Sequence, residues 1–226
     1  MRAIISHNAL ANAADETTRE IYDEEYFQGQ KVKSNYDDYI SQSRGPTLML
    51  AESLHSFFRP ESVLDVGCAV GHTVKRLREF GVESYGLDIS DWAVSVANVP
   101  YVKQSDATLE PINRAFDLVY SYDVVEHMLP QRLEFAARNL WNATAKDMLI
   151  VPATYENGEK TDPNEPTHLI FESRAWWIEF FEKIGAVYDA EATERFAQLE
   201  HSKVFDYSSR IMIFSRPRAG DQVVWG

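Results

Sequence analysis

The sequence predicts an α/β fold in which a mostly parallel β-sheet is covered by helices on both faces. Short apolar runs alternate along the chain with amphipathic helical stretches, which is typical of parallel strands joined by crossover helices. One apolar run, residues 63–66, leads into a turn with two glycines, Gly67 and Gly71, and then into a helical pattern. A strand, a tight glycine turn and a helix in this order direct a helix N-terminus toward a ligand.

The central part of the chain carries most of the predicted elements. Pro46 suits the first turn of a helix, and Pro60 ends it. Residues 148–151 are nearly all apolar, as expected for a strand that is buried on both faces. In chain order we expect strands over 62–66, 84–87, 101–103, 116–121 and 148–151, with helices over 73–80, 91–97 and 133–141.

The stretch 152–167 breaks this alternation. It is polar and is interrupted by Pro152, Gly158, Pro163 and Pro166. A loop of this length inside a compact domain is usually functional.

The C-terminal part predicts one more helix and a hairpin. The helix runs from its N-cap Ser173 to Ile184, and Gly185 closes it. We expect strands over 186–189 and 210–215 to pair antiparallel with no helix between them. The sequence thus predicts a seven-stranded sheet that ends in a C-terminal antiparallel hairpin.

The chain divides into an N-terminal extension, residues 1–45, and one domain, residues 46–226. The extension is polar and acidic, and its aromatic residues can either pack as core or form a lid that excludes water from a ligand. These residues are Tyr22, Tyr26, Phe27, Tyr36 and Tyr39.

Composition excludes several classes of function. The formal net charge of −13 repels polyanions, and no run of Lys and Arg offers a nucleic acid footprint. No apolar run approaches the ~20 residues of a membrane span. The lone Cys68 allows no internal disulfide and no cysteine-based zinc cluster. With no convincing signal peptide, we expect a cytoplasmic protein without nucleic acid or membrane partners.

Acidic residues follow four of the predicted strands: Asp65, Asp88, Asp106 and Asp123. Ligands of open α/β sheets bind at the carboxyl ends of the strands, where these carboxylates would lie. Asp88 is 88 − 67 = 21 residues past the first glycine, where nucleotide-binding units place a ribose-binding carboxylate. The spacing therefore indicates a cofactor that contains adenosine.

The glycine turn favours one such cofactor. A dinucleotide site needs G-x-G-x-x-G, whereas Ala69 occupies the middle glycine position here. The carboxylate of Asp65 at the turn entry suits an ammonium group and not a pyrophosphate. S-adenosylmethionine has an amino acid end, a sulfonium and a ribose but no phosphate, and it fits this turn better than NAD.

Residues 65–71 resemble the first motif of the class I S-adenosylmethionine-dependent methyltransferases, and residues 85–90 resemble the second. Residues 105–107 and 116–128 are similar to the adenine segment and the fourth-strand motif. The resemblance implies a Rossmann-like sheet, a ribose held by Asp88, and an adenine beside Ile89 and Asp106. The cofactor-binding residues that it implies are Asp65, Gly67, Cys68, Ala69, Gly71, Asp88, Ile89, Asp106, Ala107 and Tyr122.

Two histidines are candidates for the acceptor side. His127 follows the fourth strand at the mouth of the cofactor site, and His168 ends the long loop, which can bring it over the same mouth. An imidazole titrates near neutral pH and can act as a general base. The alternatives are that His127 only orients its loop and that His168 lies on the surface. Thr167-His168 and Trp176-Trp177 also resemble the small-molecule and sugar-modifying members.

A second resemblance leaves another function open. Asp123-x-x-Glu126-His127 with His168 is similar to the Glu-x-x-Glu-His…His metal site of small-RNA 3′-terminal 2′-O-methyltransferases. Such a set could bind Mg²⁺, Mn²⁺ or Zn²⁺. The acidic chain argues against RNA. We therefore expect methyl transfer to an oxygen or nitrogen of a small molecule at a site without metal. A metal-dependent RNA methyltransferase and a non-catalytic cofactor-binding partner subunit are the alternatives.

Overall fold

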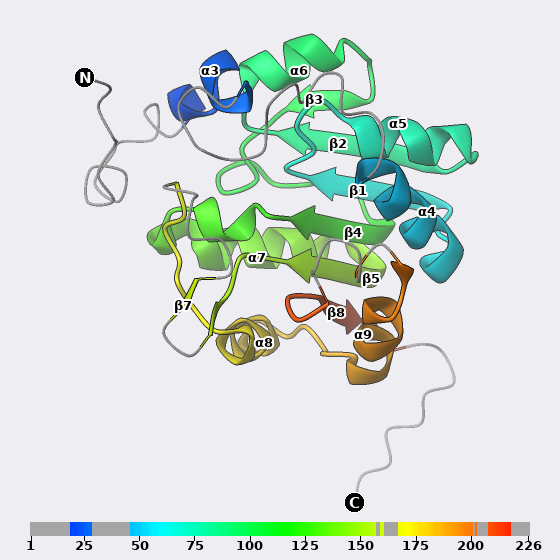
Figure 1. Ribbon diagram of the computed structural model, residues 1–226, viewed down its shortest axis with the longest axis vertical. Helices are drawn as coiled ribbons and strands as arrows, with labels where there is room; N and C mark the ends of the chain where they lie inside the picture. Colours follow the sequence, from blue (N-terminus) through cyan, green and yellow to red (C-terminus); the bar gives the residue numbers. More distant parts are fainter. Residues whose placement is uncertain are drawn as a thin grey trace, which may run out of the picture.

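A six-stranded sheet forms the centre of the protein in a computed structural model that describes residues 19–28, 46–156, 159–160, 167–200, 202 and 208–217. The strand order is β3-β2-β1-β4-β5-β8, and only β8 runs antiparallel to its neighbour (Figure 1). The strands are β1 (Ser62–Val66), β2 (Glu83–Asp88), β3 (Val102–Gln104), β4 (Phe116–Tyr122), β5 (Thr144–Val151) and β8 (Met212–Ser215). The carboxyl ends of the five parallel strands therefore meet at one edge, as the sequence predicted.

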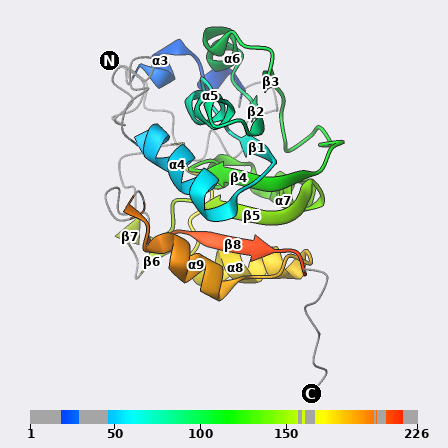
Figure 2. The same ribbon diagram turned by 90° about the vertical axis from the view of Figure 1, so that its right-hand side faces the viewer.

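Helices cover both faces of the sheet. One face carries α4 (Pro46–Phe58), α5 (His72–Glu79), α6 (Asp91–Ala97) and α9 (Ala190–Ala197), and the other carries α7 (Leu133–Asn142) and α8 (Arg174–Lys183). In Figure 2, α9 lies on the near side of β8 and α8 lies behind it. Each face of the sheet has its own hydrophobic core, and neighbouring strand residues point to opposite faces. Val63 lies in the same hydrophobic cluster as Leu54 of α4, and Leu64 lies in the same cluster as Leu140 of α7.

Local signals explain where the helices begin and end. The Ser90 hydroxyl accepts the Ala93 N–H at 3.0 Å at the start of α6, and the Ser173 hydroxyl accepts the Trp176 N–H at 3.2 Å at the start of α8. Gly185, with φ +95°, ends the helix that the sequence predicted there. The sequence predicted Ser173 and Gly185 at the two ends of α8, because caps are local interactions.

The predicted seventh strand is wrong. Within the described residues, 186–189 contributes only an isolated bridge between Tyr188 and Phe214, beside β8. A helix, α9, separates this bridge from β8 along the chain, where the sequence analysis expected none.

Helix α9 begins at an aspartate N-cap. Asp189 ends the extended segment because its carboxylate accepts the Ala192 N–H at 2.8 Å. The helix then buries Thr193 and Phe196, and the Thr193 hydroxyl accepts the Ile213 N–H at 3.0 Å. Tertiary contacts of this kind secure a helix of only eight residues, a length that is marginal for an isolated helix.

The stretch predicted as a long loop contains a short antiparallel pair, β6 (Tyr155–Glu156) with β7 (Glu159–Lys160). It leaves the end of β5 and returns to the sheet edge at Thr167. Gly158, Pro163 and Pro166 lie outside the described residues, as do Tyr36 and Tyr39 of the extension.

The described part of the N-terminal extension packs on the glycine turn. It contains α3 (Glu24–Phe27), whose Tyr26 and Phe27 are buried against Ala69, Val70 and Ala93. None of the helices in the described ranges combines the length and the hydropathy that crossing a membrane requires.

Candidate cofactor and acceptor site

The turn between β1 and α5 adopts a left-handed backbone at three positions: Gly67 at φ +87°, Ala69 at φ +49° and Gly71 at φ +73°. The backbone N–H groups of Gly67 and Cys68 both donate to the Leu87 carbonyl, at 2.7 and 3.1 Å. The turn is therefore tied to the end of β2. A left-handed alanine costs energy, and such strain persists where the surroundings hold it in place.

Gly67 also lies against the loop that follows β4. A Cβ atom at this position would be 2.2 Å from Cγ2 of Val124. Only a glycine allows this approach at this φ value. The contact joins the glycine turn to the segment that carries Glu126 and His127.

Asp88 lies at the end of β2 and is buried. Its carboxylate accepts the Ala69 N–H at 2.7 Å and the Ser90 N–H at 2.8 Å, one on each oxygen. Burial raises the pKa of Asp88, and these two hydrogen bonds oppose the rise. A carboxylate has about four acceptor positions, so both oxygens can still accept a hydroxyl each. This suits a vicinal diol such as that of ribose.

Asp65 lies on β1 and is buried beside Tyr120 of β4, whose hydroxyl donates to its carboxylate. Burial raises the pKa of Asp65 to about 7, the Tyr120 hydrogen bond lowers it, and the charge of Asp88 raises it further. A cationic ammonium group would favour the charged carboxylate. Tyr120 was missed in the sequence, although the β1–β4 register places it directly beside Asp65.

The remaining predicted cofactor residues fall into two groups. Ile89 is half-buried and follows Asp88, while the Asp106 carboxylate accepts the N–H and the hydroxyl of Thr108 at 2.8 and 2.6 Å. The side chains of a second group pack into hydrophobic clusters, so these residues offer a ligand mainly their backbone: Cys68, Ala107 and Tyr122.

The two predicted histidines come together at the same edge of the sheet. His127 ends the short 3₁₀ helix η1 (Val125–His127), and its ring centroid is 4.6 Å from that of His168. Both side chains are buried, with 9% and 4% of their surface exposed. Thr167 Oγ1 and His127 Nδ1 share a hydrogen bond of 2.9 Å. The ring of Tyr22 lies 6.0 Å from that of His127, so the N-terminal segment reaches this part of the site.

Glu126 connects the segments around the histidines and is fully buried. Its Oε1 accepts the Ala153 N–H at 2.6 Å and lies 3.9 Å from His168 Nε2. Its backbone carbonyl accepts the N–H groups of Leu169 and Ile170 at 2.8 and 3.0 Å. Burial raises the pKa of Glu126 to about 8, the charge of Asp123 adds to this, and the Ala153 hydrogen bond opposes it.

The four residues of the possible metal set do not all converge. Potential ligand atoms of Glu126, His127 and His168 lie within 4.8 Å of one another. Asp123, with φ +53°, instead pairs with the buried Arg210 at 2.8 Å. Arg210 was also missed, because nothing local in the sequence links it to a loop 87 residues earlier (210 − 123 = 87).

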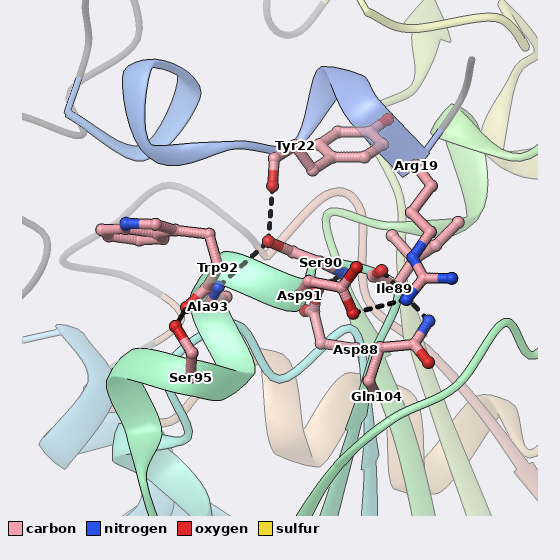
Figure 3. A network of polar contacts seen from close by, with 10 residues as sticks. All are labelled: Arg19, Tyr22, Asp88, Ile89, Ser90, Asp91, Trp92, Ala93, Ser95 and Gln104. Atoms are coloured by element: carbon pink, nitrogen blue, oxygen red, sulfur yellow. Dashed lines mark hydrogen bonds and ion pairs between the residues drawn. The ribbon is translucent and has the colours of Figure 1, made fainter. Parts of the chain in front are cut away.

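Polar contacts hold the N-terminal segment, residues 19–28, beside Asp88 (Figure 3). The Ser90 hydroxyl donates to the Tyr22 carbonyl, and Arg19 pairs with Asp91. Phe27 stacks on Trp92, with ring centroids 5.3 Å apart. The described part of the extension therefore lies over the residues that follow β2.

Known structures share this fold. Magnesium protoporphyrin IX methyltransferase from Synechocystis PCC 6803, with bound S-adenosylhomocysteine, aligns with a TM-score of 0.60 at 16% identity over 90% of this chain and 100% of that chain. A SAM-dependent methyltransferase from Archaeoglobus fulgidus aligns with a TM-score of 0.54 at 18% identity over 81% and 100%. The [4+2]-cyclase SpnF aligns with a TM-score of 0.55 at 16% identity over 76% and 82%. No curated protein matches the sequence.

The site fits S-adenosylmethionine on its own chemistry. Asp88 offers acceptors for a diol, Asp65 offers a buried carboxylate for an ammonium group, and the glycine turn lies between them. The family model of the methyltransferase domain matches residues 42–199. The chain belongs to this methyltransferase-domain family and is an S-adenosylmethionine-dependent methyltransferase.

Proposed function

We propose that this enzyme transfers a methyl group from S-adenosylmethionine to an oxygen or nitrogen atom of a small molecule. The observation that carries the proposal is the buried pair His127 and His168 at the edge of the sheet where Asp65 lies near the end of β1 and Asp88 ends β2. The close approach of Gly67 to Val124 places the glycine turn beside the segment that carries His127.

These positions give each side chain a role in the proposed reaction. Asp88 holds the ribose hydroxyls and Asp65 faces the ammonium group, which orients the bound cofactor. The reaction is an in-line displacement at the methyl carbon, and correct orientation supplies much of its rate. His127 and His168 face the acceptor and take up its proton. Thr167 orients His127 through its hydrogen bond at Nδ1.

The N-terminal segment acts as a cover over the cofactor. Tyr26 and Phe27 are buried on Ala69 and Val70 of the glycine turn. Tyr22 adds an aromatic ring beside His127. Aromatic faces attract cations such as a sulfonium, and a closed cover excludes water.

A small acceptor is favoured over a nucleic acid. The histidines are buried, and the net charge of −13 opposes the phosphate contacts on which RNA binding depends. SpnF shows that this fold also occurs in a protein named for another reaction, so the fold alone does not define the acceptor.

The test has two steps. Calorimetry with S-adenosylhomocysteine first measures cofactor binding. Purified enzyme is then incubated with methyl-labelled S-adenosylmethionine and a panel of sugars, phenols, amines and short RNAs. Label transfer to a small acceptor supports the proposal, whereas transfer to RNA 3′ ends favours the alternative. Cofactor binding with no transfer to any acceptor favours a non-catalytic partner subunit.

A further inference from the structure

We propose that Glu126, His127 and His168 bind one divalent transition-metal cation beside the methyl-transfer site. The sequence alone favoured a site without metal. In the structure, however, one potential ligand atom from each of the three side chains lies within 4.8 Å of the other two. Nitrogen and oxygen ligands lie about 2.0–2.2 Å from Zn²⁺, so two ligands on one cation are about 3–4 Å apart. Small side-chain rotations close the difference.

The carboxylate of Glu126 supplies an independent observation. The side chain is fully buried, and Oε2 has no hydrogen-bond partner among the described residues, whereas Oε1 accepts the Ala153 N–H. A buried carboxylate oxygen without a donor is costly. The carboxylate also faces an imidazole, because Oε1 lies 3.9 Å from His168 Nε2. A cation between these groups would satisfy the unpaired oxygen.

The surroundings of the imidazoles match those of metal ligands. A metal-binding histidine is normally oriented by a partner at its other ring nitrogen, and Thr167 Oγ1 bonds Nδ1 of His127. Thr167 directly precedes His168. One short segment therefore contains the ligand His168 and also the residue that orients the ligand His127. The backbone bonds from Leu169 and Ile170 to the Glu126 carbonyl hold this segment in place.

The donor set selects the class of metal. Two imidazoles and one carboxylate suit Zn²⁺, Fe²⁺, Co²⁺ or Mn²⁺, whereas Mg²⁺ and Ca²⁺ prefer oxygen ligands. Asp123 does not complete an oxygen-rich set, because it pairs with Arg210.

Three protein ligands leave coordination positions open for a further oxygen, which is typical of catalytic rather than structural sites. A cation here would bind the acceptor hydroxyl and lower its pKa, so that the hydroxyl proton passes to solvent and the oxygen takes the methyl group from the sulfonium. In this metal-bound site His127 and His168 are ligands, and solvent replaces them as the proton acceptor of the proposed function. This consequence rests on the proposed function, and it narrows the acceptor to an oxygen nucleophile.

The experiment uses Co²⁺ as the probe. Full-length protein is stripped with a chelator and titrated with Co²⁺ while its visible ligand-field absorption is recorded. We expect one equivalent to bind and Zn²⁺ to displace it. Glu126→Gln keeps an amide oxygen for the Ala153 N–H but removes the charge. Loss of a residue that only orients a metal ligand costs about 10–100-fold in metal affinity. Glu126→Gln and His168→Ala each change a ligand itself, so each should lower the affinity for Co²⁺ by more than this.

His55→Gln, on α4 and stacked on Phe80, is the matched histidine control and should bind Co²⁺ like the wild type. Absence of the spectrum in the wild type, or the same spectrum in both site variants, overturns the metal site. Calorimetry with S-adenosylhomocysteine on the same stripped samples separates the two proposals. Cofactor binding without Co²⁺ binding rejects only the metal site, and loss of cofactor binding in the wild type rejects the proposed function.

Discussion

The carboxylate of Asp88 accepts the backbone N–H of Ala69 over 2.7 Å, which fastens the end of β2 to the glycine turn after β1. The same carboxylate is the expected partner of the ribose hydroxyls. In the proposed site, one side chain thus shapes the turn and holds the ribose of the cofactor.

Replacement of Asp88 should therefore weaken cofactor binding. Asp88→Ala removes charge-assisted hydrogen bonds to the ribose, and we expect a loss of roughly 1.5–3 kcal/mol in S-adenosylhomocysteine affinity by calorimetry. Glu179→Ala, on α8 and exposed, is the control and should change affinity little. An unchanged affinity in Asp88→Ala would refute the ribose assignment.

A second prediction concerns the contact between Gly67 and Val124. Gly67→Ala places a Cβ 2.2 Å from Val124 Cγ2 at φ +87°. The left-handed backbone costs about 1–2 kcal/mol and the overpacking about 1–3 kcal/mol more, which gives a total loss of about 2–5 kcal/mol in unfolding free energy.

Gly81→Ala is the matched control for this loss. Gly81 has nearly the same φ value, +83°, but a Cβ there meets nothing within 4 Å. Denaturant unfolding of Gly81→Ala should therefore show only the loss in unfolding free energy that comes from the left-handed backbone. Equal losses in the two variants would show that the Val124 contact adds nothing.

The geometry around the glycine turn was predictable because its signals are local. The glycine spacing, the acid after each strand and the caps of α6 and α8 are all readable over a few residues. The acceptor half depends on contacts between distant segments. The ion pair of Asp123 with Arg210 and the burial of Glu126 under Ala153 follow from tertiary packing, which a single sequence does not encode in any short window. Helix α9 was missed for a similar reason, because its Thr193 hydroxyl accepts the N–H of Ile213 in β8.

Asp65 should make cofactor binding pH-dependent. Its pKa in the folded protein is raised to about 7, mainly by burial, so the carboxyl is largely neutral below this pH. An ammonium group binds the charged form, and S-adenosylhomocysteine affinity should therefore rise between pH 6 and 8. Asp65→Asn should bind more weakly at pH 8 and lose most of this dependence. Calorimetry at several pH values measures both, and an identical pH profile in the variant would contradict the assignment.

The same shift makes a prediction for stability. An acid whose pKa is higher in the folded state binds more protons when folded, so unfolding free energy falls as pH rises from the unfolded value toward about 7. Between pH 5 and 8 this amounts to about 2–3 kcal/mol. Asp65→Asn, which still offers an oxygen to the Tyr120 hydroxyl, should remove this part of the decline in denaturant unfolding. A variant that declines as steeply as the wild type would show that Asp65 titrates normally.

The histidine pair should affect turnover and leave cofactor binding intact. The ring centroids of His127 and His168 are 4.6 Å apart, and we propose that these rings face the acceptor, whereas Asp65 and Asp88, on β1 and β2, are proposed to hold the cofactor. With the acceptor identified in the panel, His127→Ala and His168→Ala should each lower turnover by about 10²–10⁴-fold, the usual cost of losing a general base. Loss of a metal ligand would lower turnover as well. Affinity for S-adenosylhomocysteine should stay within about twofold, a change of only some 0.4 kcal/mol. His55→Gln should retain full turnover, since it lies on α4 away from this edge. Full turnover in both site variants would make the histidines structural and leave catalysis to orientation alone, whereas a parallel loss of cofactor affinity would place them on the cofactor side of the site.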